Sequence, residues 1–297
     1  MLYKTFIRRS LMASAFLSVF ALTLLVMCVS ANADPASQST QQASANDAAF
    51  KAAIDTDPHL PLTAEQKRTL KVKEQRLAQF YSAAAGRVLT AEGVAALGAT
   101  AAVTSVPAAW GVAANQQSQQ RSYWCGPATL CEALGQCGVP NITQSQAATW
   151  SGTTTSGTAW SGGSTSTGHP MADALNAHQN RNDYVPQALS YSPSSSEIST
   201  YKTRLVSDIY DIWAPVIGDA FETAGSTYHL SGHPSDHTIY HWFDIFGYTA
   251  SGGYTRYEDS VSGCPTTLIG WAAGVPPYSW QPSNQVAIIC GGRGYIW

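Results

Sequence analysis

Residues 119–130 read Gln-Gln-Arg-Ser-Tyr-Trp-Cys-Gly-Pro-Ala-Thr-Leu, and this stretch predicts a turn that enters a helix at its cysteine. Gly126 and Pro127 end a polar run and are followed by the mostly apolar residues 128–134. Proline is favoured in the first turn of a helix, because an N–H there has no intrahelical acceptor to lose. We therefore expect Cys125 to lie at the N-terminus of a helix.

That position favours a reactive thiol. The partial positive charge of a helix N-terminus stabilises a thiolate, which lowers the thiol pKa and increases the nucleophilic fraction. Gln119 lies six residues before Cys125. Its side-chain amide is near enough to stabilise the oxyanion that forms when a thiolate attacks a carbonyl group. The stretch thus predicts a nucleophile and an oxyanion donor together.

The spacing of Gln119 and Cys125, with Tyr-Trp-Cys-Gly-Pro-Ala leading into a helix, resembles the papain-like cysteine peptidases. Within that clan it is most similar to secreted relatives of the double-glycine leader peptidases that process bacteriocins. Residues 144–150 and 171–176 resemble the helices that follow the nucleophile in this family. The resemblance covers about residues 111–262. It implies an α+β papain-like fold, with a helical lobe carrying Cys125 and an antiparallel β-sheet lobe.

The resemblance also implies a histidine on a downstream strand, followed by an orienting Asp or Asn. Residues 238–248 are rich in β-formers, residues 249–253 supply a turn, and residues 254–260 are predicted as the returning strand. In a hairpin centred near Ala250, His241 faces Asp259, whose carboxylate would fix the imidazole tautomer. Asp244 is expected on the opposite face of the sheet. The predicted catalytic residues are Cys125, His241, Asp259 and Gln119.

The predicted activity is hydrolysis of a peptide or protein substrate through an S-acyl enzyme, which needs no metal or organic cofactor. Two alternatives remain open. A thiol acyl hydrolase or amidase acting on cell-wall peptides would use the same residues. A non-catalytic wall-binding module would have the same fold and would bind its ligand through aromatic side chains.

Cysteine counting also bears on the nucleophile. Removal of a signal segment that contains Cys28 leaves five cysteines, and an odd number in an oxidising compartment leaves one thiol unpaired. If that thiol is Cys125, the other four allow three pairings. We favour disulfides between Cys131 and Cys137 and between Cys264 and Cys290. The alternative is that Cys125 itself is bridged.

Four histidines recur every four residues, a spacing that would line one face of a helix and could hold zinc. Gly232 and Pro234 interrupt such a helix. We therefore expect no metal site and instead expect loop imidazoles near the cleft. These histidines are His229, His233, His237 and His241.

The first 33 residues have the pattern of a secretory signal peptide. Basic residues at 4, 8 and 9 precede an apolar stretch over 11–29, and Ala31-Asn32-Ala33 offers a small-x-small cleavage site. We expect a secreted or cell-surface protein, a monomer that is not inserted in the membrane after cleavage. An uncleaved membrane anchor is the alternative, because the apolar stretch approaches spanning length.

Residues 34–110 are predicted as an N-terminal extension with one amphipathic helix and a linker, ahead of a peptidase domain over 111–297. Thr63 and Gln66 resemble a capping box, and the helix is expected to end near Gly86. The extension is interpreted either as an inhibitory propeptide or as a stalk or accessory helix packed on the main domain. The latter is favoured because a helix and a linker carry no chemistry.

Composition excludes two further classes of protein. Hydrophobic residues make up 44% of the chain, which includes 9 Trp and 14 Tyr, so the chain is too apolar for a disordered protein. The formal net charge is −3 and the 16 Lys and Arg residues form no cluster, so nucleic-acid binding is not expected. Residues 285–290 are predicted as a late strand.

Overall fold

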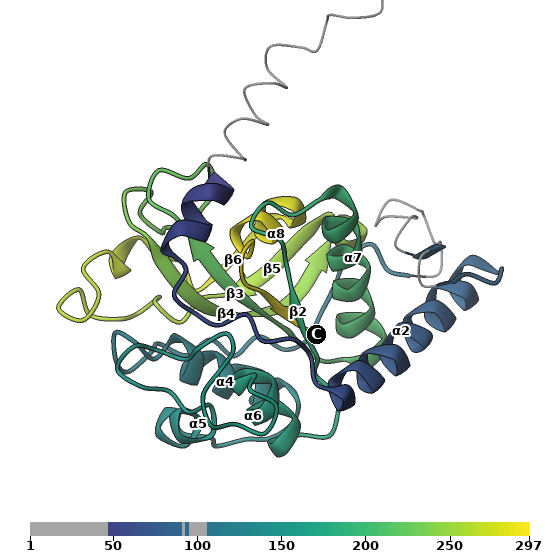
Figure 1. Cartoon of the computed structure of the whole chain (residues 1–297), viewed down its shortest axis with the longest axis horizontal. Coiled ribbons are helices and arrows are strands. Elements are labelled where there is room, and N and C mark those ends of the chain that lie inside the picture. The colour runs from purple at the N-terminus through teal and green to yellow at the C-terminus, as the bar shows by residue number, and fades with distance from the viewer. Residues whose placement is uncertain (1–46, 91–92, 95–105) are drawn as a thin grey trace, which may run out of the picture. The chain divides into compact units, whose positions relative to one another are not determined.

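The computed structural model describes residues 47–90, 93–94 and 106–297 (Figure 1). The predicted signal peptide lies outside these described residues. Residues 47–54 are helical. The labelled α-helices of the described part of the chain are α2 (Ala64–Ala85), α4 (Cys125–Gln136), α5 (Gln144–Trp150), α6 (Pro170–His178), α7 (Ser195–Val206) and α8 (Ser283–Ile289). A π-helical turn continues α7 over Ser207–Ile212, and short 3-10 turns cover Ala250–Gly252 and Ala272–Gly274.

The strands form one antiparallel sheet in the spatial order β2-β7-β3-β4-β5-β6, and β1 pairs with part of β4. Their bounds are β1 (Trp110–Gly111), β2 (Pro186–Ala188), β3 (Val216–Glu222), β4 (Ile239–Thr249), β5 (Tyr254–Glu258), β6 (Tyr278–Pro282) and β7 (Gly294–Ile296). Helices and an antiparallel sheet thus confirm the predicted α+β class.

The two faces of the sheet bury different layers. Along β4, Trp242 belongs to the hydrophobic core shared with α4 and α6, whereas Phe243 and Ile245 belong to a second core shared with α7 and α8. Successive side chains of a strand point to opposite faces, so both faces of this central strand are buried. Figure 1 shows α4, α5 and α6 together on one side of the sheet and α7 and α8 on the other.

Helix α4 is buried along almost its whole length: most of its side chains are small or apolar, and the polar Glu132 and Gln136 are buried with them. Its first turn also packs closely against a loop. A Cβ atom added at Gly126 would lie 2.1 Å from the Thr158 Oγ1, so only glycine permits this approach. The sequence around Cys125 therefore fixes where the helix begins and which loop covers it.

The predicted hairpin is present as β4 and β5, but its register differs by two or three positions from the prediction. Asp244 pairs with Glu258 and Tyr248 with Thr255, with a β-bulge between Ile245 and Gly247. Asp259 consequently lies just beyond the last pair of β5, where the chain leaves the sheet.

The strand predicted over residues 285–290 is wrong: Ser283–Ile289 form helix α8. The buried residues of this helix are Ser283, Val286, Ala287 and Ile289, which recur at the spacing of one helical face. A short apolar run cannot be assigned to strand or helix by its pattern alone. The packing of this run against α7 and β3 selects the helix.

Part of the N-terminal extension packs against the sheet domain. Helix α2 begins with a capping box between Thr63 and Gln66 and ends at Gly86, as predicted. Tyr81 of α2 is buried in the core shared with α7, and its hydroxyl donates to the Thr203 carbonyl. Lys51, ahead of this helix, donates to the Ile288 carbonyl from a buried position. Across the described residues, no helix has the length and apolar character needed to cross a membrane.

Candidate active site

The thiol of Cys125 lies at the first residue of α4, as the sequence predicts. It lines two cavities that meet at this residue, one of about 510 Å³ and one of about 320 Å³. The backbone N–H of Cys125 donates no hydrogen bond within the described part of the chain. Donors in the first turn of a helix lack intrahelical partners, so this N–H is free to bind a ligand.

Strand β4 places His241 beside Cys125. The hydroxyl of Thr129, one turn along α4 from Cys125, donates to the Trp242 carbonyl at 3.0 Å. This buried bond ties the start of α4 to the strand residue next to His241. Cys125 and His241 line the same cavity, and the interaction between their side chains lowers the pKa of the thiol and raises that of the imidazole.

Asp259 orients the imidazole from the other side. His241 Nε2 donates to Asp259 Oδ1 at 3.1 Å, and Cys125, His241 and Asp259 are all buried. The Val261 N–H donates to the same carboxylate oxygen at 2.9 Å, which holds the carboxylate in place. Because Nε2 carries the proton shared with Asp259, Nδ1 is the ring atom left to exchange a proton with Cys125.

These contacts shift three pKa values. Burial alone would raise the pKa of Cys125, but the hydrogen bond and charge of His241 outweigh it and hold the pKa below its ordinary value of 9.0. Burial would lower the pKa of His241, yet Asp259 and Cys125 hold it well above 6.5. Despite its burial, the pKa of Asp259 is held well below 3.8 by the charges of His241 and His233. The lowered pKa of Cys125 and the raised pKa of His241 favour a thiolate beside an imidazolium.

Gln119 lies in the smaller cavity with Cys125 and His241. Its side-chain Nε2 donates to the Arg121 carbonyl at 2.7 Å, and its Oε1 accepts from the Ser260 hydroxyl at 3.2 Å. An amide nitrogen has two hydrogens, so one remains for an oxyanion. The structure thus brings together all four residues that the sequence predicts for the site.

Asp244 belongs to a different cluster, as its predicted position on the opposite face of the sheet implies. It accepts from Gln136 Nε2 at 2.7 Å, and the same nitrogen donates to Glu258 at 2.9 Å. Burial, reinforced by the charge of Glu258, raises the pKa of Asp244 well above 3.8. This carboxyl group therefore belongs to the packing between α4 and the sheet.

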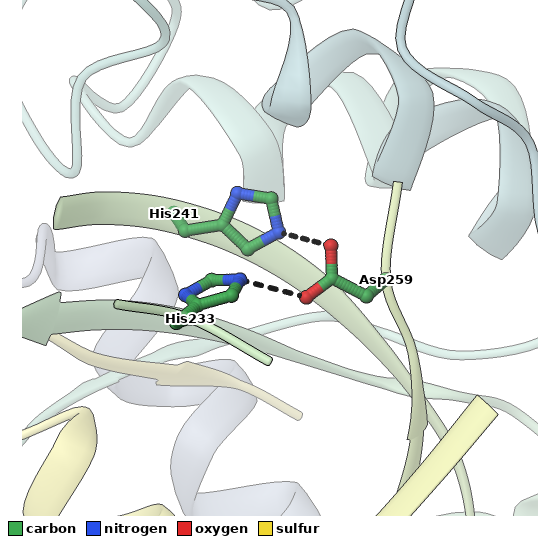
Figure 2. Close-up of side chains that lie close together, drawn as sticks. All are labelled: His233, His241 and Asp259. Atoms are coloured by element: carbon green, nitrogen blue, oxygen red, sulfur yellow. Dashed lines mark hydrogen bonds and ion pairs between the residues drawn. The ribbon is translucent and has the colours of Figure 1, made fainter. Parts of the chain in front are cut away.

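The sequence did not predict that His233 touches Asp259. His233 Nε2 lies 3.0 Å from Asp259 Oδ2 (Figure 2). On the other side of the ring, His233 Nδ1 lies 2.9 Å from Glu222 Oε1. Carboxylates only accept hydrogen bonds, so an imidazole between two of them donates from both nitrogens and is positively charged. Although burial opposes the charge, Asp259 and Glu222 raise the pKa of His233 above 6.5.

The buried groups consequently alternate in sign away from the thiol. Cys125, His241, Asp259, His233 and Glu222 follow one another in a chain of contacts. The other oxygen of Glu222 contacts His229 Nδ1 at 2.8 Å. The four-residue spacing of the histidines was a signal for this cluster, although Gly232 and Pro234 exclude the helix that such a spacing would otherwise indicate.

We expect His233→Gln to lower kcat by up to about 100-fold, because the Asp259 carboxylate loses one of its fixed donors and His241 loses its alignment. The ring of His233 is 5.2 Å from that of His241. Removing its positive charge should therefore raise the pKa of His241 and move the basic limb of the pH profile to higher pH. Measuring kcat against pH tests this.

His237→Gln is the matched control, since His237 is exposed and its imidazole is hydrogen-bonded to Asp236 at 2.7 Å. An unchanged pH profile in His233→Gln, or an equal change in the control, would show that His233 has no part in aligning the site.

The potential metal-ligand atoms of His233, His241 and Asp259 lie within 4.8 Å of one another, close enough to hold a metal ion. Each of these atoms already takes part in a hydrogen bond between an imidazole and the carboxylate. A metal ion would have to displace the proton from both imidazole nitrogens. The hydrogen-bonded arrangement accounts for all three side chains as they stand.

The predicted disulfides are wrong: Cys125, Cys131, Cys137, Cys264 and Cys290 are all free. Cys131 and Cys137 are six positions apart along α4 and its cap, so their side chains point about 120° apart. Cys264 and Cys290 belong to separate hydrophobic clusters. The alternative in which Cys125 is bridged does not hold either.

A helix N-terminal cysteine facing a strand histidine, in an α+β fold, defines the class of papain-like cysteine peptidases. The model of the Peptidase_C39 like family matches residues 111–281. The chain therefore belongs to the Peptidase_C39 like family, and the resemblance drawn from its sequence is confirmed. No curated protein and no solved structure matches the chain. Membership of this family indicates a cysteine-peptidase type of hydrolase.

Proposed function

We propose that the protein is a secreted cysteine peptidase in which Cys125, His241 and Asp259 form the catalytic triad. The single observation that carries the proposal is the contact between the Cys125 thiol and an imidazole whose Nε2 is held by a buried carboxylate. Secretion rests on the basic, apolar and small-residue pattern of residues 1–33.

The first half of the reaction forms an acyl enzyme. The Cys125 thiolate adds to the carbonyl carbon, and the carbonyl π electrons move to oxygen. The backbone N–H of Cys125 and the second amide hydrogen of Gln119 stabilise the oxyanion. When the oxyanion collapses, the C–N bond breaks and imidazolium Nδ1 of His241 protonates the leaving amine.

The second half releases the acid. Neutral His241 takes a proton from water at Nδ1 while the water oxygen attacks the thioester carbonyl. Collapse of the second oxyanion expels the Cys125 thiolate, which is again paired with imidazolium His241. Asp259 remains ionised throughout and keeps the imidazole in the orientation that both proton transfers need.

The test is incubation of the purified protein with a peptide library, followed by mass spectrometry of new amino termini. We expect internal peptide bonds to be cleaved, and we expect prior alkylation with iodoacetamide to abolish the cleavage. Parallel incubation with purified peptidoglycan separates the alternatives. Release of wall peptides or of ammonia without peptide-bond cleavage would identify an amidase, and binding without any product would identify a non-catalytic module.

A further inference from the structure

Asp219 of β3 is a buried carboxyl group for which the catalytic mechanism has no use. Its exposed fraction is 3%, and it lines the larger cavity together with Cys125. Its carboxyl oxygens are not fully enclosed by protein, and they make no hydrogen bond or ion pair with any described residue. Because an unpaired buried carboxylate is costly, native proteins rarely keep one without a ligand to satisfy it.

The neighbouring charges on the cavity wall are already matched. Arg293 Nη1 lies 2.8 Å from an oxygen of Asp55 and 3.1 Å from an oxygen of Asp57. Asp57 also accepts the Trp160 N–H at 2.9 Å. Arg293 is thus balanced by two carboxylates contributed by the N-terminal extension, and Asp219 remains an acid without a partner, whose pKa burial raises well above 3.8.

The remaining wall of this cavity carries no other ionisable side chain besides Tyr123, Tyr240 and the thiol itself, within the residues described. About half of its lining consists of serine, threonine and glycine residues from the loop between α5 and α6. Such a surface offers hydroxyl groups and no charge to oppose a cation. An anionic group would meet Asp219 and Asp57, and it would compete with Asp55 and Asp57 for Arg293.

The position of the catalytic groups assigns this cavity to one side of the scissile bond. His241 protonates the leaving amine, and His241 and Gln119 both line the smaller cavity. The amine side of the substrate therefore leaves through the smaller cavity. The larger cavity, which shares Cys125 but neither of those residues, receives the acyl side.

We propose that Asp219 binds a cationic group, an ammonium or guanidinium, on the acyl side of the scissile bond. This inference rests on the proposed function, because it names a substrate class for the same site. The cation would supply the partner that the carboxyl group lacks, and the hydroxyl-rich wall would complete its hydrogen bonds. A lysine or arginine side chain and a free α-amino group carry the same chemistry.

The test uses coumarin amides of acetylated dipeptides in which either residue is lysine or norleucine. Norleucine peptides with a free α-amino group form a further arm, which distinguishes the two sources of the cation. We expect kcat/KM to be higher for one cationic position by about tenfold or more in the wild-type protein. Asp219→Asn should abolish this preference and still cleave the norleucine peptides. Asp236→Asn, at an exposed carboxylate, is the matched control and should keep it.

Equal kcat/KM values for cationic and neutral peptides in the wild-type protein would overturn the proposal, and so would a preference that persists in Asp219→Asn. Lysyl and norleucyl chloromethyl ketones add a readout that requires only thiol labelling. If the wild-type protein cleaves no peptide but the lysyl reagent labels Cys125 faster, the cation site stands and the proposed function fails. If the wild-type protein cleaves peptides without preferring the cationic ones, the proposed function stands and the cation site fails.

Discussion

Cys125→Ala is expected to abolish peptide hydrolysis, with a fall in kcat of about 10⁶-fold, which is the loss of the whole covalent pathway. The thiol is the only described group in either cavity placed to form the acyl enzyme, since it lines both cavities and contacts His241. The measurement is the initial rate of cleavage of a fluorogenic peptide.

Cys131→Ala is the matched control, because Cys131 is a free and buried cysteine of the same helix. We expect it to retain activity and to lose stability by about 1 kcal/mol. Undiminished hydrolysis by Cys125→Ala would show that Cys125 is not the nucleophile. Equal losses in both variants would indicate a packing defect of α4 and would not support covalent catalysis.

His241→Ala is expected to lower kcat by about 10⁴-fold while the thiol stays in place. Two functions are lost together, the stabilisation of the thiolate and the protonation of the leaving amine. Burial alone raises the pKa of Cys125, and the hydrogen bond with His241 is the largest influence that lowers it. In this variant the pKa should therefore rise.

The measurements are steady-state kinetics and the rate of alkylation of Cys125 at pH 7. His237→Ala serves as the control from the same segment, because this imidazole is exposed and contacts Asp236. If His241→Ala retained the wild-type alkylation rate, the imidazole would not be the group that activates the thiol.

Much of the site follows from local sequence. Gly126 and Pro127 place Cys125 at a helix start, and the run of β-formers places His241 on a strand. The expected length of the hairpin predicted that Asp259 lies beside His241. The observed register is displaced, but Asp259 follows the last residue pair of β5 and still contacts the imidazole.

The remaining parts depend on contacts that sequence spacing does not encode. Glu222 and His233 are eleven positions apart and meet because β3 and β4 are hydrogen-bonded neighbours with a folded loop between them. Asp219 reaches the cavity of Cys125 because β3 lies beside β4 in the sheet. The disulfide prediction failed for the same reason, since counting cysteines says nothing about which clusters they join.

The most direct test of the ion pair is the pH dependence of carbamidomethylation at Cys125, followed by mass spectrometry of the intact protein and its peptides. Because the pKa of Cys125 is lowered and that of His241 is raised, the thiolate should persist as pH falls below 9. We predict an alkylation rate that falls by clearly less than tenfold for each pH unit below 9. A rate that falls about tenfold for each pH unit below 9, as for an isolated thiol, would contradict the account.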